Sequence, residues 1–301
     1  MADRRLQVFH AVAKHLSFTK AAEALFMTQP AVTFQIKQLE EHFNTRLFER
    51  GHGRIALTSA GDIVLDYAER ILGLSAELDT RLKEMTGQIA GLLLIGASTT
   101  IAEFLLPRVL GDFKSRHPNV VPRLFVANSG AVENRVAEHT LDIGFIEAPS
   151  HLAAVATDVC CEDELVVVCG PAHPLAQHKA LTPKQLVEHP YISRESGSGT
   201  REVTDAYFQK AGVRPESLKV VMELGSPEAL KGLVATGLGF TIMSRATVQK
   251  ETRLGELVSL PLAPRLIRNL SVVYPKEKFR SRLVNTFVQF AKERLAKNLP
   301  G

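Results

Sequence analysis

Apolar residues recur every three or four positions through residues 4–43, which is the spacing of amphipathic helices. The pattern predicts three short helices: residues 4–15, a helix opening at Thr19, and a third helix over residues 29–43. Thr28 is the expected N-cap of the third helix, and Pro30 suits its first turn because the amides there have no intrahelical partner. The side chains expected to fill a common core are Leu6, Phe9, Val12, Ala13, Ala22, Leu25, Phe26, Val32, Ile36, Leu39 and Phe43.

The opposite face of the third predicted helix is polar or flat, and it carries no acidic side chain before Glu40. A helix that enters a major groove by its N-terminus needs such a face, because acids would repel the phosphates and small polar groups can contact base edges. The same periodicity also suits an ordinary surface helix of a three-helix bundle, and both interpretations are open at this point. The side chains on this face are Pro30, Thr33, Phe34, Lys37 and Glu41.

Two short apolar runs, residues 46–50 and 55–59, flank the glycine-containing residues 51–54 and predict a β-hairpin, or wing. At its tip, Arg54 can enter a minor groove. Arg46 and Arg50 can contact phosphates from the flanking strand.

A single long helix is predicted from about Ala60 to Gln88, with Ser59 as its cap. Apolar or small side chains follow one another at four- and three-residue spacing along it, which is the heptad pattern of a self-associating helix. They are Val64, Ala68, Ile71, Ser75, Leu78, Leu82 and Met85. The pattern favours a homodimer through this helix; packing of the helix against the C-terminal region of the same chain is the alternative.

From Leu92 onward, strand-like runs alternate with helical segments, which is typical of parallel α/β structure. The expected strands are residues 92–96, 121–126, 143–146, 165–169, 191–193, 220–224, 240–243 and 270–274. The expected helices are residues 100–117, 132–138, 183–189, 199–211, 227–236 and 280–296. The chain as a whole is therefore expected to be an α/β protein with a helical N-terminal part.

Hydroxyl, amide and glycine residues, with one arginine, follow the expected strands at four places where helices begin. In open α/β sheets a ligand lies at the carboxyl ends of the strands, against helix N-termini that attract negative charge. Each residue alone is best interpreted as a helix cap, but together they favour a small anion bound in this region. They are Ser98, Thr99, Thr100, Asn128, Ser129, Ser196, Gly199, Thr200, Arg201 and Ser226.

Charge is unevenly distributed, although the formal net charge of +4 over 301 residues does not indicate a general polycation. Residues 1–58 hold eight lysines and arginines against five acids, whereas residues 59–90 hold three against six, which suits DNA contact at the N-terminal end. The first residues lack the apolar core of a signal peptide and no run is long enough to span a membrane, so a cytoplasmic protein is expected. The ten histidines and three cysteines show no metal-ligand spacing, and neither a metal nor a cofactor is expected.

The stretch from Phe9 to Gly61 resembles the DNA-binding domain of LysR-type transcriptional regulators. The matching segments, in order and spacing, are F-x-A-V-A, S-F-T-x-A-A-E-x-L, T-Q-P-A-V-T, Q-I-x-Q-L-E, R-L-F-E-R and L-T-x-A-G. The residues that the resemblance places at the groove and the phosphates are Thr28, Gln29, Pro30, Thr33 and Lys37, with Arg54 in the wing. The family commonly has arginine where this chain has Phe34, so this ring is expected to touch a thymine methyl or a sugar instead.

The C-terminal region resembles the periplasmic-binding-protein-like effector domain of the same family. The resemblance implies a winged helix-turn-helix over 1–58, a linker and dimerisation helix over 59–90, and an effector-binding domain over 91–301. Two lobes are then expected, one of residues 92–162 with 266–301 and the other of residues 163–265. The resemblance also implies a homodimer through the long helix and a homotetramer on promoter DNA, with RNA polymerase as a further candidate partner.

The segment from Glu195 to Arg201 is similar to its equivalent in regulators of carbon-fixation and sulfur-assimilation genes within that family. This similarity implies a sulfur oxyanion, a phosphorylated metabolite or a small carboxylate as the effector.

Three other classes of protein fit the sequence less well. An enzyme is not expected, because the glycine-flanked Ser198 lacks the G-x-S-x-G context of a nucleophile. A thiol-redox-sensing regulator of the same family would use Cys160, Cys161 or Cys169, but the first two are adjacent and the third lies in an apolar strand. A free-standing small-molecule-binding protein would need a signal peptide and would not carry residues 1–88.

Overall fold

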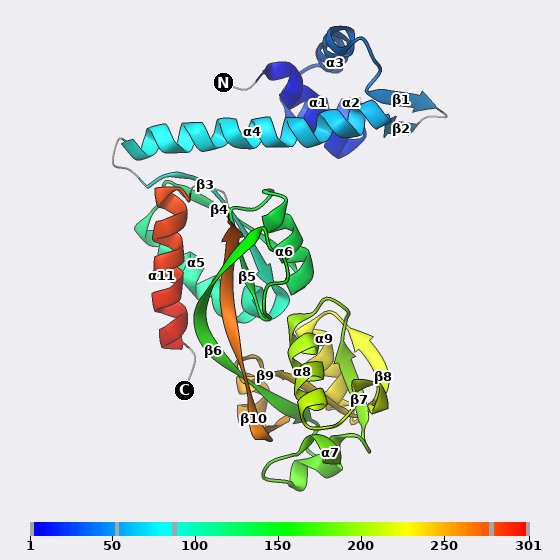
Figure 1. Cartoon of the computed structure of the whole chain (residues 1–301), viewed down its shortest axis with the longest axis vertical. Coiled ribbons are helices and arrows are strands. Elements are labelled where there is room, and N and C mark those ends of the chain that lie inside the picture. Colours follow the sequence, from blue (N-terminus) through cyan, green and yellow to red (C-terminus); the bar gives the residue numbers. More distant parts are fainter. Residues whose placement is uncertain (1–2, 52–53, 86–88, 277–279, 299–301) are drawn as a thin grey trace. The chain divides into compact units, whose positions relative to one another are not determined.

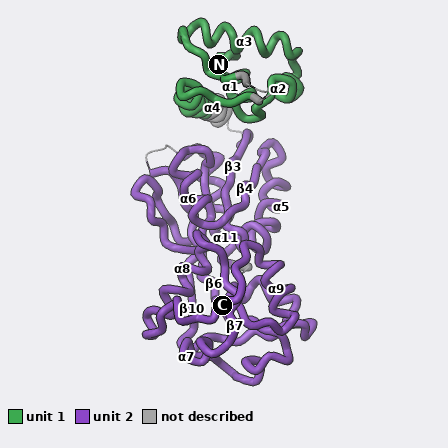
Figure 2. Tube along the Cα trace, turned by 90° about the vertical axis from the view of Figure 1, so that its right-hand side faces the viewer, with its two compact units in different colours: residues 1–88 green, residues 89–301 purple. Residues whose placement is uncertain are grey.

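The computed structural model of the chain describes residues 3–51, 54–85, 89–276 and 280–298. Within these ranges the side chains of residues 50, 51, 54, 76, 77, 79–85, 297 and 298 are not described. The chain divides into two compact units, residues 1–88 and residues 89–301 (Figure 2).

The first unit contains three short helices, a two-stranded hairpin and a long helix (Figure 1). The helices are α1 (Arg4–His15), α2 (Phe18–Ala24) and α3 (Gln29–Phe43). The side chains that cap them by accepting a backbone N–H are Asp3, Ser17 and Thr28. The hairpin pairs β1 (Phe48–Gly51) with β2 (Arg54–Leu57), and α4 runs from Ser59 to Met85.

Two of the side chains predicted to fill the core of this unit do not lie in it. Phe26 is 98% exposed, because it follows the end of α2 in a left-handed backbone conformation (φ 54°) and helical spacing no longer sets its direction. Phe43, the last residue of α3, is 44% exposed. Leu47 and Phe48 are buried in this core instead, and the Glu40 carboxylate accepts both of their backbone N–H groups, at 2.8 and 3.3 Å.

Among the described side chains of the long helix α4, those that pack into this core lie near its beginning. Ala68 is fully buried and Val64 packs beside it, whereas Ile71 and Leu78, from the same predicted heptad seam, are 41% and 51% exposed. The Leu82 and Met85 side chains lie outside the described residues. Val64 and Ala68 therefore belong to the core of the first unit. Ile71 and Leu78 are apolar side chains that remain exposed in a single chain.

The second unit is built on one eight-stranded sheet with the order β4-β3-β5-β10-β6-β9-β7-β8. The strands are β3 (Gly91–Ser98), β4 (Val120–Ala127), β5 (Ile143–Ile146), β6 (Val155–Cys169), β7 (Pro190–Arg194), β8 (Lys219–Leu224), β9 (Phe240–Ser244) and β10 (Val258–Pro275). Pairing is parallel among β3, β4 and β5 and among β7, β8 and β9, whereas β10 runs antiparallel to β5 and β6. This arrangement gives two parallel halves joined by two long antiparallel strands.

The helices of this unit follow the strands in the expected order. A π-helical turn (Ile101–Leu105) leads into α5 (Leu106–Arg116), so the predicted helix over 100–117 is not α-helical throughout. The other helices are α6 (Ser129–Ala137), α7 (Pro183–Leu186), α8 (Gly199–Lys210), α9 (Pro227–Ala235), α10 (Gln249–Leu254) and α11 (Arg282–Asn298). Short 3₁₀ turns lie at Pro174–Gln177, Pro215–Ser217 and Arg245–Val248.

The two joining strands are much longer than the runs predicted at residues 165–169 and 270–274. Strands β6 and β10 pair with each other from Val155 opposite Pro275 to Cys169 opposite Val258. The central parts of both strands are polar or contain proline, so no apolar pattern in the sequence marks them as strands. The pairing also shifts register between Pro261 and Leu266. Hydrogen bonding between two segments far apart in the chain holds these parts as strands.

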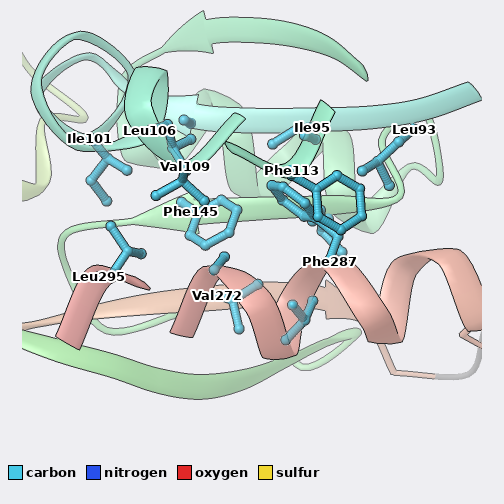
Figure 3. Close-up of a cluster of buried hydrophobic side chains, with 14 of the residues drawn as sticks. Leu93, Ile95, Ile101, Leu106, Val109, Phe113, Phe145, Val272, Phe287 and Leu295 are labelled. Carbon is cyan, nitrogen blue, oxygen red and sulfur yellow. The ribbon is translucent and has the colours of Figure 1, made fainter. Parts of the chain in front are cut away.

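Two main cores stabilise the unit, one in each half of the sheet. In the first, Phe113 from α5, Phe145 from β5 and Phe287 from α11 meet edge to face, with ring centres 4.9 and 6.2 Å apart (Figure 3). In the second, the rings of Tyr191 and Phe240 stack at 5.1 Å. Each half therefore packs as a lobe with its own core, and the polar residues described below lie where the lobes meet.

Candidate DNA interface and effector site

The N-terminal part of α3 presents an exposed polar surface. Thr28, Gln29, Pro30 and Lys37 are exposed, and the Gln29 side-chain amide donates to the Thr33 hydroxyl at 3.0 Å. No acidic residue lies in the first turn of α3. Its positive helix end and its hydrogen-bonding side chains are therefore free of a negative charge that would repel DNA.

The other candidate DNA contacts are Thr33, Phe34 and two arginines of the wing. Half-buried Thr33 lies at the edge of the α3 face, and Phe34 is 57% exposed. Lys37 lies 3.6 Å from Glu41, but this pair is well exposed and contributes little to stability. The side chains of Arg50 and Arg54 lie outside the described residues.

In the second unit, three of the predicted anion-binding hydroxyls contact one internal residue, Glu147, two of them through its carboxylate. Glu147 follows β5, and its oxygens accept hydrogen bonds from Ser98 at 2.5 Å and Thr200 at 2.8 Å. The Glu147 backbone N–H donates to the Ser129 hydroxyl at 3.2 Å. Ser98, Ser129 and Thr200 therefore lie together, as the sequence predicts. The residue that they surround is Glu147 of the protein itself, not a bound anion.

Arg268, on β10, joins this carboxylate to a second one. Its guanidinium donates to Glu147 at 2.7 Å, to the Thr200 hydroxyl at 2.8 Å and to Asp163 at 2.8 Å. A further guanidinium nitrogen lies 2.7 Å from the same Asp163 oxygen, without the angle of a hydrogen bond. We refer to Ser98, Ser129, Glu147, Asp163, Thr200, Ser244 and Arg268 as the interlobe cluster, in which Ser244 donates to Asp163 at 2.6 Å.

The interlobe cluster is almost completely buried, and its charges depend on one another. Burial alone would raise the pKa of Glu147, but Arg268 and the hydroxyls of Ser98 and Thr200 lower it to about 2. Burial opposes the charge of Arg268, and the two carboxylates raise its pKa nevertheless. Both members of the pair are therefore ionised at neutral pH.

A second buried arginine lies close to the cluster. Arg194, at the end of β7, is 4% exposed and pairs with Glu195 through two hydrogen bonds of 2.8 and 3.1 Å. Its charge contributes to the low pKa of Glu147. Burial and Glu228 raise the pKa of Glu103, on the π-helical turn, and Arg194 opposes that rise. Charged groups of both signs thus gather around Arg194.

Backbone and side-chain contacts hold the two lobes together beside these charges. The Gly130 N–H donates to the Gly197 carbonyl at 3.3 Å, and the Asn128 side chain donates to the Ser196 carbonyl at 3.2 Å. A Cβ at Gly199 would lie 2.8 Å from the Ser129 hydroxyl. Glycine at position 199 is thus required by the close approach of α8 to the first lobe.

Comparison with protein-family models decides what kind of protein has this architecture. The model of the LysR substrate-binding domain matches residues 86–296, and that of the bacterial regulatory helix-turn-helix protein of the lysR family matches residues 4–62. The chain belongs to the LysR family. It is a DNA-binding transcriptional regulator, as the resemblance predicted.

Individual relatives place this LysR-family regulator near those of carbon-fixation genes. A RuBisCO operon transcriptional regulator of Acidithiobacillus ferrooxidans is 35% identical, over 95% of this chain and 92% of the relative. The CcmR regulatory domain of Synechocystis PCC6803, solved in complex with 2-PG, is 28% identical, with a TM-score of 0.63 over 70% of this chain and 99% of that domain. CbnR, at 20% identity, shares the fold with a TM-score of 0.71 over 98% and 99% of the two chains.

The other predicted effector residues of the LysR-family regulator lie outside the interlobe cluster. Thr100 is buried and its side chain does not cap the π-helical turn, while Thr99 is half-buried. Arg201 pairs with Glu223 at 2.9 Å, and the exposed Ser226 caps α9. Glu147, Asp163, Arg194 and Arg268 were not predicted as site residues, because no sequence motif marks a charged residue within a strand or directly after one.

The cysteines of the regulator do not have the properties of a redox sensor. Burial raises the pKa of Cys160 to about 11 and that of Cys161 to about 12, so the reactive thiolate is scarce at neutral pH. Cys161 and Cys169 are eight residues apart on strand β6, roughly 26 Å, which is far beyond the reach of a disulfide. These properties disfavour the thiol-sensing alternative.

Among the described residues, no helix is both long and apolar enough to cross a membrane.

Proposed function

We propose that this regulator binds a small phosphorylated metabolite between its two lobes, and that the bound anion changes its interaction with promoter DNA. The observation that carries the proposal is the presence of two buried arginines, Arg194 and Arg268, beside hydroxyls from both lobes. The relative CcmR supports the chemical class, because its regulatory domain was solved in complex with 2-PG.

Arg194 is the side chain best suited to receive the ligand. Arg268 is balanced by two carboxylates, and its side chain is 1% exposed. Arg194, in contrast, pairs with the single carboxylate of Glu195, whose side chain is 28% exposed and has room to move toward solvent. A phosphate can take the place of Glu195 and keep two parallel hydrogen bonds to the guanidinium.

The residues proposed to surround the anion combine the sequence prediction with the two arginines. Backbone amides and hydroxyls at the helix starts would bind the remaining phosphate oxygens, because a buried N–H without a partner is costly. The proposed set is Ser98, Thr99, Thr100, Asn128, Ser129, Arg194, Ser196, Gly199, Thr200, Arg201, Ser226 and Arg268. In this account Glu147 and Glu195 are internal anions that keep the arginines paired.

We further propose that α3 and the wing contact DNA through the exposed polar surface described above. The contact residues in this proposal are Thr28, Gln29, Pro30, Thr33, Phe34, Lys37, Arg50 and Arg54. The regulator would form a homodimer through α4 and a homotetramer on DNA, with RNA polymerase as a further partner, and would act in the cytoplasm. It would work by binding alone, because the Glu147 carboxylate that accepts from Ser98 and Thr200 pairs with Arg268 and has a pKa lowered to about 2, which makes it too weak a base to activate a hydroxyl.

Calorimetry on the full-length protein tests the effector proposal. We expect 2-PG to bind wild-type protein, and Arg194→Gln to weaken binding at least tenfold because a charge-assisted pair is lost. Arg294→Gln is the matched control, since Arg294 on α11 pairs with Asp112 at 3.3 Å and is not one of the proposed binding residues, and we expect it to change affinity less than threefold. Inorganic phosphate and sulfate serve as comparison anions. Wild-type affinity for 2-PG in Arg194→Gln would refute the proposed site.

A further inference from the structure

Phe26 combines two unfavourable features at the turn between α2 and α3. Its side chain is 98% exposed, so the ring gains no burial in the folded chain. Its backbone is left-handed (φ 54°), a conformation that crowds the Cβ of any residue other than glycine. The first unit thus keeps a large apolar side chain where neither packing nor backbone geometry favours it.

The helix ending around Phe26 shows what residue the position would ordinarily hold. Helix α2 closes with a Schellman motif, in which the N–H of Met27 donates to the Ala22 carbonyl at 2.9 Å and that of Phe26 to Glu23 at 3.2 Å. The left-handed residue of this motif is usually glycine, and sometimes asparagine. Leu16, after the end of α1, is also left-handed (φ 43°), but its side chain is only 51% exposed. Phe26 combines the unfavourable backbone with almost complete exposure, and this combination needs a reason.

Helix α3 offers the comparison within the same unit. It ends in the same motif, with the Thr45 N–H donating to the Glu40 carbonyl at 3.1 Å. Its left-handed residue is Asn44 (φ 48°), one of the residues that the motif favours. The chain thus uses the favourable residue at the far end of α3 and an unfavourable one just before its beginning.

Phe26 precedes Thr28, the N-cap of α3, by two residues, so it lies beside the end of α3 proposed to enter the major groove. The one apolar group that a base pair displays in that groove is the 5-methyl of thymine. We propose that Phe26 covers the 5-methyl of a thymine at the edge of the bound half-site and so helps to select the operator. This inference rests on the proposed entry of α3 into the groove.

The test uses full-length protein and a duplex that the wild type selects from a randomised pool. Phe26→Asn restores the residue type of the matching position 44, so we expect an unfolding midpoint no lower than that of the wild type. We expect the same variant to bind the selected duplex about tenfold more weakly. Phe43→Ala, at the opposite end of α3 and about 21 Å along its axis, is the control for loss of an exposed ring and should retain wild-type affinity.

Replacing single thymines by uracil identifies the contact, because uracil lacks only the methyl group. At one position we expect uracil to weaken wild-type binding and to have no effect on Phe26→Asn, so that the two losses are not additive. Wild-type affinity in Phe26→Asn would overturn the inference, and so would additive losses at every thymine. If α3 does not enter the groove, Gln29→Ala and Lys37→Ala will also bind DNA normally. These two variants therefore distinguish failure of the Phe26 contact from failure of the proposed α3 interface.

Discussion

Replacing Glu147 by glutamine tests the buried charges of the interlobe cluster. The substitution keeps the shape of the side chain and removes its charge, so Arg268 loses one of its two carboxylate partners at 2.7 Å. The lowering of the Glu147 pKa from 4.5 to about 2 corresponds to ~3 kcal/mol in favour of the ionised, folded state. We therefore expect Glu147→Gln to lower the free energy of unfolding by about 3 kcal/mol at pH 7, within the range for broken buried pairs.

The same substitution predicts a particular dependence on pH. The folded-state pKa of Glu147 lies below its unfolded value, so its contribution is complete above about pH 4.5 and is lost as the pH falls toward about 2. The difference in stability between wild type and Glu147→Gln should therefore be constant from pH 7 to about pH 5 and should shrink below that.

Urea unfolding followed by tyrosine fluorescence measures this difference. The chain has no tryptophan, and three of its four tyrosines, Tyr191, Tyr207 and Tyr274, lie in the second unit, so the signal reports chiefly on that unit. Glu223→Gln is the control, because Glu223 is an exposed partner of Arg201 and its loss should cost less than about 1 kcal/mol. Equal stability of Glu147→Gln and wild type at pH 7, or a difference that does not shrink in acid, would refute the reasoning.

Two further predictions concern the first unit. Lys37→Ala should weaken binding to all DNA sequences and flatten its salt dependence, whereas Gln29→Ala should relax base preference. Each substitution should cost roughly 1–3 kcal/mol of binding free energy at the selected site. Fluorescence anisotropy over a salt series distinguishes the two effects, and normal affinity in both variants would exclude α3 as the helix that contacts the bases. Leu78→Asp places a charge on the exposed apolar side of α4 and should dissociate the proposed dimer. Sedimentation velocity at micromolar concentration measures the dissociation, and an intact dimer would show that the heptad seam of α4 is not the interface.

The elements that could be predicted from the sequence are those fixed by local signals. Helix α3 has a capping threonine, a proline in its first turn and an unbroken apolar stripe, and its predicted bounds are confirmed. Strand β5 is a short buried apolar run whose predicted bounds, residues 143–146, are also confirmed. In both cases the residues that determine the element lie within it.

The parts that could not be predicted depend on partners distant in the chain. Strand β6 extends over polar residues because β10, about a hundred residues later, pairs with it. The ion pair of Glu147 and Arg268 joins residues 121 positions apart, and the pattern around either one carries no trace of the other. Phe26 was placed in the core because helical spacing was continued past the residue where α2 ends.

A crystal structure of the full-length protein in complex with 2-PG would show whether the effector binds between the lobes. We expect the phosphate between the lobes, with its oxygens within hydrogen-bond distance of the Arg194 guanidinium and of amides or hydroxyls at the start of the helices after β3 and β7. We also expect that Glu195 no longer pairs with Arg194 in that complex. A ligand bound at any other place, or an Arg194–Glu195 pair unchanged beside the bound ligand, would contradict the proposed effector site.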